Sequence, residues 1–299
     1  MATNKTPSSP KLLTPVHFFS HGTPSMLGQE STSADYWEKC GQAALRHGVK
    51  HIIIMGAHWS ALNDEIQVSM NPNPGKDPIG GVHPRWYKDY KLIPDLPMGE
   101  HVIQLLRDSG FNAKPNKSCV WIHDIYTLII RMFPGGNMPP TTVLSTNARY
   151  DPHFHMRMGM ALRSLRSRPD VLLMGTGGAV HNLYRNVWGP IVKYNDNFAQ
   201  EVPPANWALN FRQEFEDAVM KNSGPALRRA VVSLMKLPDF RDAHATDDHF
   251  IAACFCAGLV GHEDDVGAPV EFGAETWELG NMCNDQYTFG SWEAFPVAC

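Results

Sequence analysis

The chain of 299 residues lacks the features that mark several large classes of protein. It has no apolar run of about 18 residues, which a membrane-spanning helix would need. Its first 14 residues are polar and lack the apolar core of a signal peptide. No basic stretch stands out in a chain of formal net charge −4, which argues against nucleic acid or an anionic membrane as a partner. We therefore expect a cytoplasmic protein that binds neither.

Cysteine is scarce, and the usual catalytic motifs are missing. The six cysteines are scattered without a C-x-x-C pair, which predicts reduced thiols and argues against a zinc–cysteine site. Ser20 and Ser145 end predicted strands but lie outside any G-x-S-x-G nucleophile elbow. The glycine-rich stretch 176–178 has neither the G-x-G-x-x-G pattern nor a phosphate-loop lysine, and no H-E-x-x-H is present.

What the sequence does contain is an alternation of short apolar strands with amphipathic helices. This order is typical of a mostly parallel sheet flanked by helices. We predict an α/β fold with a disordered polar tail, residues 1–14, followed by a single domain, residues 15–299. Residues 71–97, rich in Pro and Gly, are expected to form a long ordered loop. The expected strands are 15–20, 51–56, 141–145 and 170–175, and the expected helices are 31–47, 98–109, 122–132, 152–167, 206–221, 225–237 and 247–260.

Three of the 14 histidines follow predicted strands. His21 follows the first strand, His58 the second, and His181 the strand that ends in a glycine-rich turn. Since the carboxyl ends of parallel strands share one edge of a sheet, these imidazoles should meet there. Neutral imidazole is a good ligand for Zn, Fe, Ni and Cu, and the absence of cysteine favours an open, catalytic metal site.

Two further histidines begin predicted helices, His249 and His123. His249 is a fourth candidate ligand at the same edge and His123 a fifth candidate. Asp247 and Asp248 offer an alternative carboxylate ligand, which we rank below His249 and below helix capping. The remaining histidines are interpreted as structural or solvent-exposed: His47, His51, His83, His101 and His262 on helix ends, loops or turns, and His153 and His155 capping or solvating a helix start. His244, five residues before His249, is interpreted as a loop histidine, with support of the metal ligands from behind as the alternative.

Taken in order, the histidine motifs resemble the 4,5-DOPA extradiol dioxygenase family of class III ring-opening dioxygenases, from about residue 15 to residue 261. The resemblance implies a single α/β domain that cleaves a catechol-type ring with O2 and Fe(II), with zinc able to occupy the same ligands. By motif match, His21, His58 and His249 hold the metal, and His181 is the acid–base histidine or a fourth ligand. His123 matches a histidine that helps to position substrate. The motifs are Ser20-His21-Gly22-Thr23-Pro24, Ala57-His58-Trp59, His181-Asn182-Leu183 and Asp248-His249-Phe250.

Parts of the chain depart from the family pattern. The helix start reads Ile122-His123-Asp124 where the family has Asp-His-Gly, residues 186–204 look like added length, and residues 271–299 are hard to match. The substrate, the native metal and the oligomeric state therefore stay open. So does the role of the tryptophans at 188, 207 and 277. Two alternatives remain, a zinc-dependent hydrolase or carbon–carbon lyase that does not use O2, and a non-catalytic metal-binding protein on the same scaffold.

Overall fold

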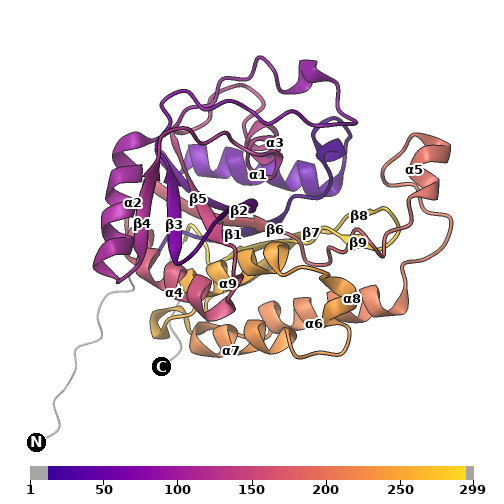
Figure 1. Ribbon diagram of the computed structural model, residues 1–299. Helices are drawn as coiled ribbons and strands as arrows, with labels where there is room; N and C mark the ends of the chain where they lie inside the picture. The colour runs from indigo at the N-terminus through magenta and orange to yellow at the C-terminus, as the bar shows by residue number, and fades with distance from the viewer. Residues whose placement is uncertain (1–12, 294–299) are drawn as a thin grey trace, which may run out of the picture.

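A mixed sheet of eight strands forms the centre of the molecule (Figure 1). The computed structural model describes residues 13–293. Within them the strand order is β4-β3-β5-β2-β6-β1-β10-β7, and β8 and β9 form a separate hairpin. The strands are β1 (Val16–Ser20), β2 (His51–Ala61), β3 (Glu65–Ser69), β4 (Asn112–Asn116), β5 (Thr141–Asn147), β6 (Val171–Gly177), β7 (Val270–Ala274), β8 (Trp277–Glu278), β9 (Met282–Cys283) and β10 (Gln286–Phe289).

The four central strands, β5, β2, β6 and β1, run parallel. They are apolar and buried along most of their length, as expected for strands covered on both faces. The predicted α/β fold with a mostly parallel central sheet is confirmed. Its carboxyl edge lies at the ends of β1 and β6, where the chain leaves each strand for a loop.

Helices cover both faces of the sheet (Figure 1). α1 (Thr32–Arg46) and α3 (His123–Met132) pack on one face, and α2 (Leu96–Asp108), α4 (Pro152–Leu162) and α9 (Asp248–Val260) pack on the other. α7 (Gly224–Leu234) packs against α9, and α6 (Asn206–Met220) packs against α7 and the β7 end of the sheet. The residues of α9 from His249 to Val260 are all buried, because the sheet, α4 and α7 surround the helix.

Several short strands of the structure were not predicted from the sequence. β4 (NAKPN) is polar and contains a proline, and it pairs with β3 at one end of the sheet. At the other end of the sheet, β10 pairs antiparallel with β1, and β7 pairs antiparallel with β10. Of the tail from residue 271, residues 271–274 and 286–289 thus belong to the central sheet, β8 and β9 form the hairpin between them, and residues 294–299 lie outside the described residues. Short α5 (Gly189–Tyr194) and α8 (Phe240–Ala243) were also not predicted.

The predicted loop, the N-terminal tail and the cysteines can now be compared with the structure. Residues 71–97 form a long loop that contains a 3₁₀ turn, Pro84–Trp86, and isolated β-bridges at Lys76 and Pro94 before α2 begins. Residues 1–12 of the predicted tail lie outside the described residues, whereas Leu13 and Thr14 are buried and Thr14 N donates to Arg166 O over 2.8 Å. The five cysteines of the described residues are buried free thiols. No helix described here is long and apolar enough to cross a membrane.

Candidate metal centre

His21 and His249 reach the carboxyl edge of the sheet from different elements. His21 follows β1 directly, and His249 lies in the first turn of α9. The approach of α9 is close, since a Cβ at Gly177, the last residue of β6, would overlap the His249 carbonyl. The Nδ1 atom of His21 lies 3.0 Å from Thr176 Oγ1, so its Nε2 atom is directed away from this partner. Such a bond to the second ring nitrogen fixes the orientation of an imidazole ligand.

His58 arrives by a different route from the one predicted. It does not follow β2 but lies inside it, where the pairing with β5 shifts register between Met55 and Ser60. At this irregularity the Asp124 carboxylate replaces the sheet partner. Its Oδ2 atom accepts from Ala57 N over 2.7 Å and from His58 N over 3.0 Å. This supporting role of Asp124 was not predicted from the sequence, although Asp124 follows His123 directly.

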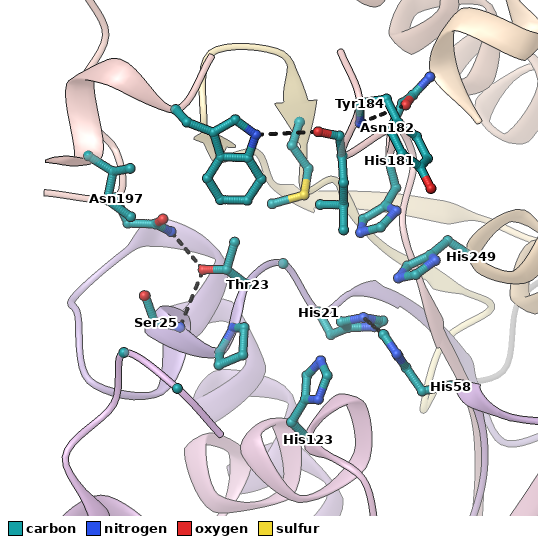
Figure 2. A pocket seen from close by; sticks show the side chains of 18 of the residues that line it. His21, Thr23, Ser25, His58, His123, His181, Asn182, Tyr184, Asn197 and His249 are labelled. Carbon is teal, nitrogen blue, oxygen red and sulfur yellow. Dashed lines mark hydrogen bonds between the residues drawn. The ribbon is translucent and has the colours of Figure 1, made fainter. Parts of the chain in front are cut away.

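The structure brings His21, His58 and His249 together (Figure 2). One potential ligand atom from each of the three lies within 4.8 Å of those of the other two. The Nε2 atoms of His21 and His58 are 3.2 Å apart. Two imidazole nitrogens that bind one ion at about 2.1 Å lie roughly 3 Å apart, so this pair already has the spacing of two ligands.

The chemistry of the three histidines fits a divalent metal. Neither ring nitrogen of buried His249 has a hydrogen-bond partner, which is costly unless another group satisfies them. Burial, reinforced by the neighbouring imidazoles, lowers the pKa of His21 and His249 well below the usual value. Both rings are therefore neutral near pH 7 and present lone pairs, the form in which histidine binds metals.

His123 and His181 extend this cluster on two sides. His123 is the first residue of α3, and its ring centroid lies 4.4 Å from that of His58. The ring of His181 stacks on His249 with centroids 3.4 Å apart and planes inclined by 8°. Burial is the main cause that lowers the pKa of each to about 4. All five imidazoles line the same cavity.

Two other histidines are more deeply buried than predicted. His244 lies in the loop between α8 and α9, as predicted, but it is fully buried, and its Nε2 atom lies 3.0 Å from Ala179 O. It supports the turn before His181, whose N–H donates to Ala243 O. His155, expected to cap or solvate a helix, is also fully buried. The sequence missed both because a residue outside a strand or at a helix start is usually exposed.

Asp247 and Asp248, the alternative carboxylate ligands, are not part of the group of three histidines that could hold a metal. Asp247 pairs with Arg241, whereas Asp248 Oδ2 lies 3.1 Å from Nδ1 of His249. The two atoms make no hydrogen bond, so both ring nitrogens of His249 stay without a partner. A further group, Glu275 with Cys283 and Asp285, also has ligand-like spacing. It pairs with Arg212 through both carboxylates, which accounts for its charge without a cation.

The cavity in front of the histidines has a volume of about 700 Å³. Much of its far wall comes from the predicted added segment, including Trp188, Ile191 and Asn197. Thr23 and Ser25 lie on that side too, opposite the imidazoles (Figure 2). The sequence signal for these residues was the extra length of the segment.

A buried carboxylate, Glu278, holds this wall to the His21 loop. It accepts from Thr23 N and Thr23 Oγ1, over 2.9 and 2.7 Å, and also from the side-chain amides of Asn197 and Asn284. Burial raises the pKa of Glu278 to about 7. Gly22 has a φ of +64°, and a Cβ there would overlap the Glu278 carboxylate, so this turn requires glycine.

Comparison with known proteins places these features in a family context. Residues 15–290 match the family described as the catalytic LigB subunit of aromatic ring-opening dioxygenase. The chain is 26% identical to 4,5-DOPA dioxygenase extradiol of Portulaca grandiflora over 281 residues, covering 92% of this chain and 95% of the relative. It is 29% identical to Dioxygenase tasH of Hapsidospora irregularis over 136 residues, covering 44% and 41% of the two chains.

A solved structure agrees with the fold. The crystal structure of an uncharacterized protein from Escherichia coli K12 superposes with a TM-score of 0.70 at 19% identity, covering 92% of this chain and 99% of that one. At this identity the similarity supports the fold alone. The family match and the Portulaca relative confirm the resemblance predicted from the histidine motifs.

Proposed function

Because the chain belongs to the family of catalytic LigB subunits of aromatic ring-opening dioxygenases, we propose that it opens a catechol-type ring by extradiol cleavage with O2. The observation that carries this proposal is the cluster of His21, His58 and His249 at the base of a cavity with room for an aromatic ring. We assign these three histidines as the ligands of an Fe(II) ion. With bound substrate, the iron would supply acidification of the catechol hydroxyls and activation of O2.

The two flanking histidines take part in the reaction in this proposal. His181 accepts the proton of a catechol hydroxyl on a ring nitrogen, and later returns a proton to the cleaved product. Its pKa of about 4 keeps it unprotonated at neutral pH, the state that a proton acceptor needs. His123, at the opposite side of the cluster, orients the substrate by hydrogen bonding to an oxygen of the diol. The apolar walls of the cavity hold the ring and exclude water.

Oxygen uptake by the reloaded protein tests the reaction. Metal-free protein is loaded anaerobically with Fe(II) or with Zn(II), and O2 consumption and the absorbance of a ring-cleavage product are measured with catechols. We expect uptake with Fe(II) only. Three imidazoles also form the ligand set of catalytic zinc sites. Full metal occupancy without uptake would therefore favour the zinc-dependent hydrolase or lyase, and carbonyl compounds would be tested next.

Substitutions test the assigned roles. His58→Ala should lose stoichiometric metal, because it removes one of three ligands. His181→Ala should keep most of the metal and lose activity by about 10²–10⁴-fold, the usual contribution of a general acid–base group. His101→Ala, an exposed histidine on α2, is the matched control. Stoichiometric metal and full activity in His58→Ala would show that the ligand assignment is wrong.

A further inference from the structure

The two regions that departed from the family pattern pack against each other. The added segment, residues 186–204, lies along the β8–β9 hairpin. Val187 N donates to Leu279 O over 2.7 Å, and Asn281 Nδ2 donates to Arg185 O over 2.7 Å. The wall of the cavity that these regions form is therefore held by hydrogen bonds between them.

That wall is predominantly apolar where it faces the cavity. Trp188 and Ile191 line it from the added segment, Leu183 from the preceding turn, and Met282 from β9. The one polar atom of the indole, Nε1, donates to Leu183 O over 3.3 Å. Since this donor is already satisfied, Trp188 offers a bound molecule its apolar ring rather than a hydrogen bond.

Positive charge is absent from the lining of the cavity. Among the described residues, no lysine or arginine lines it, and its single acid is Asp248, beside His249. The basic residues within and just before the added segment form ion pairs with other groups. Arg185 pairs with Asp242, and Lys193 pairs with Glu201. A carboxylate bound against this wall would gain no cationic partner from the lining, so any part of it that became buried would bind unfavourably.

The same wall leaves large apolar side chains open to solvent. Trp188 is 49% exposed and Leu183 is 47% exposed, although both line the cavity. A catechol ring seated at the histidines fills only part of a cavity of about 700 Å³. An apolar substituent on that ring would extend along the wall and cover these side chains, which would contribute to binding.

We propose that the substrate is a catechol carrying an uncharged, apolar substituent of several carbons, and not a catechol with an amino-acid or carboxylate side chain. This inference rests on the proposed function. The histidines bind the diol, and the wall of Leu183, Trp188, Ile191 and Met282 selects the substituent. Selection acts on affinity through burial of apolar surface and through exclusion of an unpaired anion.

Equilibrium binding tests the proposal without requiring turnover. The Zn(II)-loaded full-length protein is titrated calorimetrically with 4-methylcatechol, 4-butylcatechol and 3-(3,4-dihydroxyphenyl)propanoate. Each methylene that becomes fully buried strengthens binding by about fourfold. We expect the butyl compound to bind at least about tenfold more tightly than the methyl compound, and the carboxylate to bind more weakly than both. Equal affinities, or tightest binding of the carboxylate, would overturn the proposal.

Neighbouring positions on α5 provide matched variants. Ile191 lines the cavity, whereas Val192 is 84% exposed and does not line it. Ile191→Ala should reduce the preference for butyl over methyl several-fold, and Val192→Ala should leave it unchanged. Ile191→Arg places a cation in the wall and should shift the preference toward the carboxylate. Equal effects of the two alanine variants, or no shift in Ile191→Arg, would contradict selection by this wall.

Oxygen uptake separates this inference from the proposed function. If the Fe(II)-loaded enzyme consumes O2 with unsubstituted catechol but binds the butyl compound no more tightly than the methyl one, the substrate class is wrong and the reaction stands. If no catechol supports uptake while the butyl compound binds most tightly, the reaction is wrong and the apolar selectivity of the cavity stands.

Discussion

Replacing Asp124 should disturb the metal centre although Asp124 is not assigned as a ligand. The side chain is 1% exposed, and its Oδ2 atom receives hydrogen bonds from the backbone of Ala57 and His58. These two amides lie where β2 loses its regular pairing with β5. In Asp124→Ala they have no acceptor from this side chain, and the backbone that carries His58 is released from α3.

The size of the effect follows from the two hydrogen bonds. A buried amide left without a partner costs about 1–3 kcal/mol. Because Ala57 is buried and His58 borders the cavity, we expect Asp124→Ala to lower the free energy of unfolding by about 3 kcal/mol in total. Loss of such a supporting partner typically weakens metal binding by about 10–100-fold. Urea unfolding of metal-free protein and competition for Zn(II) with a chelator measure the two effects separately.

Two further variants serve as controls for Asp124→Ala. Asp124→Asn keeps one oxygen acceptor for the two amides and places its NH2 group at Oδ1, which has no partner, so it should lose about half as much stability or less. Asp35→Ala removes an exposed carboxylate from the first turn of α1 and should cost about 0.3–1 kcal/mol without affecting metal affinity. If Asp124→Ala behaves like Asp35→Ala in both assays, Asp124 does not position His58.

Two further predictions concern buried groups outside the metal centre. His155 accepts a hydrogen bond from Asn147 N, and burial lowers the pKa of His155 from 6.5 to about 4. As pH falls, the unfolded chain therefore takes up a proton at this histidine before the folded chain does. About 3 kcal/mol of the free energy of unfolding should be lost as pH falls from about 6.5 to 4. His155→Gln should reduce the pH dependence of urea unfolding over this range by up to one proton, and an unchanged slope would refute the assignment. Arg166 and Asp265 form an ion pair whose side chains are 0% and 1% exposed. Asp265→Ala would leave the buried Arg166 charge without this partner and should lower the free energy of unfolding by about 3–5 kcal/mol. A loss below about 1 kcal/mol would show that Arg166 finds another partner.

The sequence predicted the central strands and most helices because their signals are local. The runs at 51–56 and 170–175 are apolar and bounded by polar or glycine residues, which is the pattern of a strand covered on both faces. β4 and β10 escaped prediction for the opposite reason. β4 is a polar segment that becomes a strand only because β3 lies beside it, and β10 joins the sheet only by pairing with β1 and β7.

In the candidate site too, some residues have a local signal in the sequence and others do not. His21, His58, His181, His249 and His123 were found because they stand where predicted strands end or helices begin, and the geometry of a parallel sheet brings such positions to one edge. The supporting groups have no local signature. Asp124 and Glu278 act on residues that are 66 and 255 positions distant in the chain, a relation that a single sequence does not contain.

By itself, then, the sequence determined the fold class, the edge of the sheet that carries the histidines and the identity of those histidines, because periodicity and strand order are properties of neighbouring residues. Only the tertiary structure decided that His58 lies inside an irregular strand, that His155 and His244 are buried, and that residues 186–204 meet the β8–β9 hairpin to form an apolar wall. These features depend on contacts between segments far apart in the chain, where burial and hydrogen-bond satisfaction outweigh local preference.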